Sequence, residues 1–306
     1  MSEQIVSLNK VSKHYKNFIA VQDLSLTVNR GDVFGFLGPN GAGKSTTMRM
    51  MLSLIQPNSG SIKIFNEELS KKRNEIMRRI GCIIEKPDFY LYMSAEKNLS
   101  IFSRLSGVDA SKKRIYELLE TVGLKGREND KVKTYSHGMK QRLGIAQTLI
   151  HNPELIVLDE PTTGLDPQGI IDVREMILRL KNEMNKTVIL SSHILSEIEL
   201  VANRMIIINK GKEIVQGDVS ELLSSQNLLL TVETDDCTAV KNSINDFWKS
   251  KLKNEEHHLM NFSVSHSEIP ELVKELNKSS AKIFSINYRR ALEEYFLKLT
   301  SENSRA

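Results

Sequence analysis

Short apolar runs alternate with helical patterns over roughly the first 215 residues. Val33–Leu37 and Leu155–Leu158 are apolar without interruption, which is typical of strands buried on both faces of a sheet. After the first of these runs, Met48, Met51 and Leu52 recur at helical spacing. This alternation predicts βαβ units around a mainly parallel sheet. Further strands are predicted at Ser61–Phe65, Gly81–Ile84, Thr187–Leu190 and Met205–Ile208.

Two segments of the first domain depart from that alternation. Residues 24–28 place Leu24, Leu26 and Val28 between polar residues, which predicts an antiparallel edge near the N-terminus. Residues from about 86 to 152 are mostly helical in pattern. We therefore expect a helical subdomain there, with its clearest helices at Lys112–Val122 and Met139–Ile150.

The pattern changes again from Asn227 onward. A strand-like segment, Leu228–Glu233, is followed by a polar helical stretch, a second strand at Ile283–Tyr288 and a final helix from Ala291 to Leu299. We expect a small C-terminal α+β domain at residues 219–306, beside a first domain at residues 1–218.

Composition narrows the class of protein. With 42 Lys and Arg against 38 Asp and Glu, the net charge of +4 does not favour a nucleic-acid partner. No run of 18 apolar residues predicts a membrane span, and Met1–Gln4 shows no secretory signal. Cys82 and Cys237 fit neither a disulfide framework nor a zinc motif. These features favour a cytosolic protein.

A phosphate-binding loop follows the strand Val33–Leu37. The residues Gly38-Pro39-Asn40-Gly41-Ala42-Gly43-Lys44-Ser45 fit the pattern GxxxxGK[ST] between a strand and a helix. Its glycines let backbone N–H groups converge on phosphate oxygens at a helix N-terminus. Lys44 supplies charge to the β- and γ-phosphates, and the Ser45 hydroxyl is suited to Mg²⁺. We expect the loop and the following Thr46 to bind a nucleotide.

Two acids end the strand Leu155–Leu158. Asp159 is expected to meet the metal ion held by Ser45, and Glu160 to polarise the attacking water. An apolar strand ending in two acids is by itself a weak signal. The phosphate loop earlier in the chain favours the catalytic interpretation.

Four further motifs make a family resemblance visible. Thr134–Arg142 resembles the signature sequence of ATP-binding-cassette (ABC) ATPases, and Gly164-Leu165-Asp166 resembles their D-loop. His193 resembles their switch histidine, and Tyr15 the aromatic residue that stacks on adenine. The resemblance covers roughly residues 3–217. It implies a P-loop NTPase fold, ATP and Mg²⁺ as ligands, and hydrolysis of ATP.

The resemblance also implies partners. In this family, residues at the positions of Ser136, Gly138 and Asp166 contact ATP bound by an opposite cassette, so that two cassettes dimerise head to tail. The cassettes work beneath separately encoded transmembrane permease subunits. We expect this chain at the cytoplasmic face of the membrane, with a second cassette supplied by another copy or by a partner.

One position suggests a branch of the family. Glu85 stands where the family usually has a glutamine that links the metal site to the membrane partner, so we assign it to the catalytic and metal-binding residues. With Glu85 and the following Phe89-Tyr90, the chain resembles the ATPases of exporters that carry bacitracin and lantibiotic peptides and confer self-immunity. The same branch is suggested by Gly138–Ala146 and Leu292–Phe296. His137 and Met139, in contrast, depart from the usual signature.

Other functions remain open at this point. The exporter could carry another cargo, such as a lipid, a glycan or a drug. A soluble ABC ATPase of translation or DNA repair would usually fuse two cassettes or insert a long coiled coil, and the chain has neither pattern. An importer cassette would be expected to keep glutamine at position 85.

Overall fold

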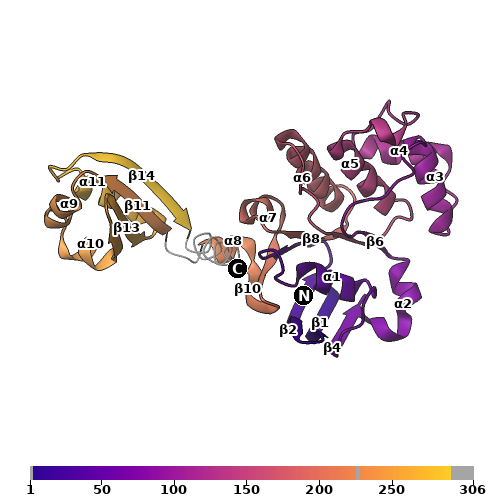
Figure 1. The fold of residues 1–306 in the computed structure, drawn as a ribbon, viewed down its shortest axis with the longest axis horizontal. Coiled ribbons are helices and arrows are strands. Elements are labelled where there is room, and N and C mark those ends of the chain that lie inside the picture. The colour runs from indigo at the N-terminus through magenta and orange to yellow at the C-terminus, as the bar shows by residue number, and fades with distance from the viewer. Residues whose placement is uncertain (1–2, 225–227, 291–306) are drawn as a thin grey trace. The chain divides into compact units, whose positions relative to one another are not determined.

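The computed structural model describes residues 3–224 and 228–290, which fall into two units, Met1–Val219 and Ser220–Ala306 (Figure 1). Separate clusters of buried apolar side chains form the cores of the two units.

The first unit is built around a six-stranded sheet. In spatial order its strands are β10 (Lys212–Asp218), β9 (Arg204–Asn209), β3 (Val33–Leu37), β8 (Thr187–Ser192), β7 (Leu155–Leu158) and β6 (Ile80–Ile83). All neighbours pair in parallel except β10, which runs antiparallel to β9. The predicted mainly parallel sheet is therefore confirmed. The carboxyl ends of β3, β7 and β8 lie at one edge, where the predicted phosphate loop and acids follow.

The antiparallel strands near the N-terminus form a sheet of their own. Its order is β2 (Phe18–Asn29), β1 (Gln4–Tyr15), β4 (Ser59–Ile64) and β5 (Glu67–Glu68). The sequence placed Leu24–Val28 at an antiparallel edge of the parallel sheet, whereas β10 forms that edge. The reason is the hairpin between β1 and β2, in which two 12-residue strands satisfy each other's backbone groups.

Helices cover the sheets and form the helical side of the unit. They are α1 (Lys44–Met51), α2 (Leu69–Met77), α3 (Ala95–Leu105), α4 (Lys112–Thr121), α5 (His137–Thr148), α6 (Pro167–Asn182) and α7 (Leu195–Val201). Helix α8 (Val219–Ser224) spans the boundary between the two units along the chain. Hydroxyl groups of Ser94, Ser111 and Ser136 accept backbone N–H bonds at the starts of α3, α4 and α5. These three helices lie within the segment predicted to be helical and group together in Figure 1.

The second unit is a small α+β domain, as predicted. Its elements are β11 (Leu228–Thr234), α9 (Cys237–Ser243), α10 (Asp246–Lys251), β12 (Leu252–Glu256), β13 (Leu259–Val264), α11 (Ile269–Leu276) and β14 (Ile283–Arg290). The antiparallel sheet has the order β12-β13-β11-β14, which is the split βαβ arrangement of ferredoxin-like domains. The hairpin of β12 and β13 was not predicted. The helix predicted at Ala291–Leu299, including Leu292–Phe296, lies outside the described residues.

Candidate active site

The phosphate loop joins β3 to α1, as its sequence context predicted. Gly41 and Gly43 have φ of 78° and 105°, in the left-handed region that favours glycine. A Cβ atom at Gly43 would lie 2.6 Å from the carbonyl oxygen of Ala20. The loop therefore depends on glycine for both its backbone angles and its close approach to β2. Helix α1 begins at Lys44, so its positive dipole end lies at the loop.

The Lys44 side chain lies along the loop and is almost completely buried. Its Nζ donates to the carbonyl oxygens of Gly38 at 2.7 Å and Pro39 at 3.3 Å. It also pairs with Oε1 of Glu160 at 3.2 Å. The ammonium group is thus held between the loop and Glu160. A phosphate group bound in the loop would lie close to both Lys44 and Glu160.

A pocket opens beside the loop. The pocket is lined by the phosphate loop and the start of α1, by two residues of β2 and by Glu160. The lining residues are Asn40, Gly41, Ala42, Gly43, Lys44, Ser45, Thr46, Phe18, Ala20 and Glu160. Tyr15, the predicted adenine-stacking residue, pairs with Phe18 across the β1/β2 hairpin and is 44% exposed. Phe18 was not predicted to be part of the site. Its position three residues after Tyr15, at the start of an apolar strand, was the available signal.

Asp159 and Ser191 form a buried link between β7 and β8. The Ser191 hydroxyl donates to Asp159 Oδ1 at 2.6 Å and accepts the backbone N–H of Glu160 at 2.8 Å. Asp159 is 5% exposed and Ser191 is fully buried. Ser191 therefore holds both acids in place, although no sequence motif identified it.

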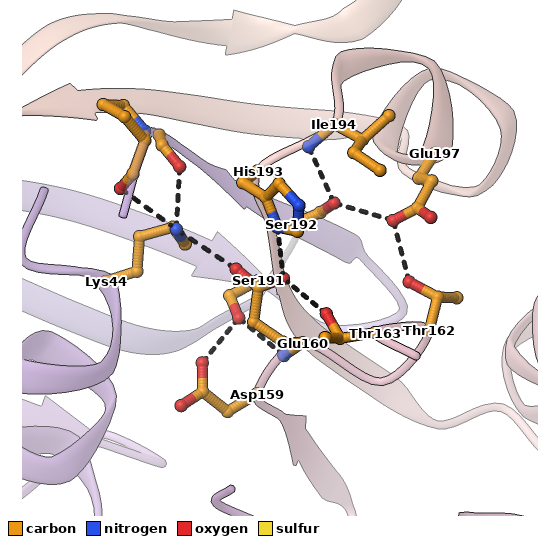
Figure 2. Close-up of polar contacts among 12 residues, drawn as sticks. Lys44, Asp159, Glu160, Thr162, Thr163, Ser191, Ser192, His193, Ile194 and Glu197 are labelled. Atoms are coloured by element: carbon orange, nitrogen blue, oxygen red, sulfur yellow. Dashed lines mark hydrogen bonds and ion pairs between the residues drawn. The ribbon is translucent and has the colours of Figure 1, made fainter. Parts of the chain in front are cut away.

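Glu160 and His193 are brought together as expected for a catalytic pair (Figure 2). His193 Nδ1 lies 2.7 Å from Glu160 Oε2, to which the Thr163 hydroxyl also donates at 3.0 Å. Burial would raise the pKa of Glu160, but the charge of Lys44 and the contact with His193 outweigh it and lower this pKa below its ordinary value. Glu160 is thus an anion at neutral pH, in contact with a cation and an imidazole.

Glu85 is placed differently from the catalytic pair. It follows β6, has φ of 67°, and its carboxylate forms an ion pair with Arg49 on α1. Its side chain is 70% exposed. The assignment of Glu85 to the metal ligands and catalytic residues therefore has no contact to support it in this structure, because the left-handed turn directs the side chain to Arg49.

The signature and D-loop residues lie beside each other. Ser136 caps α5, and Asp166 caps α6 by accepting the Gly169 N–H at 3.0 Å. A Cβ atom at Gly164 would lie 3.6 Å from His137 Nε2. Gly138 is half-buried at the first turn of α5. A Cβ atom there would lie 4.0 Å from Leu165 Cδ2, so the start of α5 adjoins the D-loop within one chain.

Two further features of the described residues concern metal ions and membranes. Across residues 3–224 and 228–290, no group of three or more His, Cys, Asp or Glu side chains is arranged to hold a metal ion. No helix in that part of the chain is both long and apolar enough to cross a membrane.

Known proteins are similar to this chain in sequence and in fold. The family model described as ABC transporter matches residues 21–163. The ABC transporter ATP-binding protein YhcH of Bacillus subtilis is 38% identical over 301 residues, covering 97% of this chain and 96% of YhcH. The bacitracin transport ATP-binding protein BcrA of Bacillus licheniformis is 49% identical over 208 residues, covering 68% of each chain.

A solved structure has a similar fold. The dimeric ATP-binding cassette MJ0796, in a post-hydrolysis state with ADP and Pi, superposes with a TM-score of 0.64. It is 26% identical, and the match covers 70% of this chain and 99% of that one. Together with the phosphate loop and the Glu160–His193 pair, these likenesses identify the chain as a member of the ABC transporter family, an ATP-binding subunit that hydrolyses ATP.

Proposed function

We propose that Glu160 activates the water that attacks the γ-phosphate of ATP and that His193 holds Glu160 and this water in place. The observation that carries the proposal is the unbroken chain of contacts from the phosphate loop through Lys44 and Glu160 to His193. An anionic Glu160 is the protonation state that a general base requires. Backbone N–H groups of the phosphate loop and the Lys44 ammonium would hold the phosphates in line for attack.

The residues around the loop also fit Mg²⁺. The Ser45 hydroxyl and the Asp159 carboxylate are oxygen donors of the kind that Mg²⁺ accepts, and a nucleotide site leaves the other positions to phosphate oxygens and water. Bound there, the ion would neutralise charge on the phosphates. Glu85 would join these residues only after leaving Arg49.

The chain is proposed to act as a head-to-tail dimer beneath separately encoded permease subunits, at the cytoplasmic face of the membrane. Ser136 and Gly138 at the start of α5 and Asp166 at the start of α6 would then face ATP bound by the opposite cassette. The dimeric MJ0796 cassette supports this assembly, as does the similar fold of CbiO1 from Clostridium perfringens, part of the transporter complex cbiONQ. Nucleic acid is not a proposed partner.

The proposed cargo is an antimicrobial peptide of the bacitracin or lantibiotic type, exported for self-protection or resistance. Two relatives named bacitracin transport ATP-binding protein support it, and the one from Enterococcus faecalis is 34% identical over 307 residues, 97% of this chain. A second candidate is another cargo, such as a lipid, a glycan or a drug. It is favoured by the Nod factor export ATP-binding protein I of Cupriavidus pinatubonensis, 40% identical over 231 residues.

The test is a protection assay in a sensitive host that carries the chain with its permease. Growth inhibition by bacitracin, several lantibiotics and a panel of lipophilic drugs is measured for the wild type, Glu160→Gln and Asp172→Asn. Asp172 pairs with Arg142 on the helical side and serves as the matched carboxylate control. Peptide protection that is lost only in Glu160→Gln supports the proposal. Protection against a drug alone, or against nothing, overturns the peptide cargo but leaves the ATPase intact.

A further inference from the structure

A second carboxylate lies directly behind the catalytic pair. Glu197 is on α7, and its Oε2 atom accepts two hydrogen bonds, from Thr162 Oγ1 at 2.8 Å and from Ser192 Oγ at 2.7 Å (Figure 2). One oxygen atom thereby joins the loop that follows β7 to the end of β8. No motif in the sequence predicted a role for Thr162, Ser192 or Glu197.

Both partners of Glu197 lie within two residues of the catalytic pair along the chain. Thr162 precedes Thr163, whose hydroxyl donates to Glu160 Oε2 at 3.0 Å. Ser192 precedes His193, and its hydroxyl also accepts the backbone N–H of Ile194 at 3.0 Å. The turn that carries His193 is therefore tied to Glu197 through Ser192, and the loop that carries Glu160 is tied to it through Thr162.

We propose that Glu197 is a positioning residue for ATP hydrolysis, which sets the spacing between Glu160 and His193 by holding their two loops together. It acts through Thr162 and Ser192 and touches no phosphate itself. The inference rests on the roles proposed above for Glu160 and His193.

The catalytic pair needs such a support. Glu160 has φ of 49°, a left-handed conformation that persists only where its surroundings enforce it. The His193 side chain is 38% exposed, so little packing restrains it. Hydrogen bonds to a carboxylate are among the stronger ones in proteins. A loss of both would let the loops separate, and small displacements of catalytic groups reduce turnover steeply.

The experiment compares turnover with ATP affinity in purified full-length variants. Glu197→Ala removes the shared acceptor and is expected to lower kcat roughly 10- to 100-fold, with ATP affinity within about twofold of the wild type. Glu197→Gln keeps an amide oxygen that can accept both hydroxyl groups, so we expect it to keep kcat within roughly threefold of the wild type. Ser196→Ala, an exposed position on the same helix, is the control.

The outcomes separate this inference from the proposed function. Wild-type kcat in Glu197→Ala overturns the positioning role, as do equal losses in the Ala and Gln variants or a parallel loss of ATP affinity. If Glu197→Ala does not fold, Thr162→Val removes one hydroxyl at nearly constant shape, and an unchanged kcat in that variant overturns the role too. If Glu160→Gln retains turnover, the proposed function itself fails, whatever Glu197 does.

Discussion

The contact between Lys44 and Glu160 predicts that neutralising the acid changes ATP affinity as well as turnover. In the structure the nearly buried ammonium has Glu160 as its anionic partner, at 3.2 Å. A phosphate group bound in the loop would compete with Glu160 for Lys44 and would be repelled by its charge. In Glu160→Gln both effects are absent, so ATP should bind more tightly while hydrolysis is lost.

The size of the effect follows from the geometry. Two unit charges at 3.2 Å attract by about 5 kcal/mol at an effective dielectric constant of about 20. Most of this is offset by desolvation, because Lys44 is only 6% exposed, and Glu160 at 24% exposure is partly screened by water. Hydrogen bonds to charged groups retain about 1.5 kcal/mol at the lower end of their range. ATP affinity should therefore rise roughly tenfold, and kcat should fall about 10²- to 10⁴-fold.

The assay measures ATP binding by titration and melting temperature with and without ATP. Without ATP, Glu160→Gln should melt about 3–6 °C below the wild type, since 1 kcal/mol corresponds to about 2–4 °C in a unit of this size. With saturating ATP the difference should nearly vanish, because Lys44 regains an anionic partner. Asp172→Asn should change neither quantity selectively. Weaker ATP binding in Glu160→Gln, or an unchanged melting temperature without ATP, would refute the reasoning.

Three further predictions concern the loop, the second unit and Glu85. Gly43→Ala should abolish ATP binding and destabilise the first unit by roughly 2–3 kcal/mol, seen by titration and melting, because its φ is 105° and the added Cβ meets a carbonyl oxygen. The hydrogen bond from Lys251 holds the Glu268 pKa at about 2, against 4.5 unperturbed. The resulting stability is complete above pH 4.5 and lost as pH falls toward 2. In urea melts followed by Trp248 fluorescence, the free energy of unfolding of Glu268→Gln should be lower than that of the wild type at neutral pH. The two values should converge near pH 2. Glu85→Gln should retain ATP binding but alter peptide tolerance per ATP hydrolysed, and unchanged tolerance would contradict its coupling role.

Strands buried on both faces could be predicted from sequence almost to the residue. Val33–Leu37 and Leu155–Leu158 have the same bounds in the structure because every side chain in them is buried. Which sheet a strand joins could not be predicted. The alternation in Leu24–Val28 indicates that one face of the strand is apolar, but it does not identify the neighbouring strand. The strand Leu252–Glu256 was missed because its sequence is almost entirely polar and lies at a sheet edge.

In the site, too, residues in local motifs could be predicted, whereas residues that depend on distant contacts could not. The phosphate loop, Asp159, Glu160 and His193 were predicted because the chemistry of each is bound to a local sequence context. Phe18, Ser191 and Glu197 were missed because their importance comes from contacts with residues 31 to 35 positions away, or from the lining of a shared pocket. For residues whose contacts are distant in sequence, the available signal was a polar residue on an otherwise apolar strand, as at Ser191.

The two acids that follow β6 and β7 show that a position after a buried strand does not by itself decide the role of an acid. Glu85 and Glu160 both come after neighbouring buried strands, and both have left-handed backbones, with φ of 67° and 49°. Glu160 is held by Lys44 and His193, whereas Glu85 is largely exposed and paired with Arg49. An exposed ion pair contributes about 0–1 kcal/mol, so Glu85 can leave Arg49 at little cost. Glu160 cannot leave its partners as easily, which suits the fixed catalytic base proposed for it, whereas the exposed Glu85 can exchange its partner.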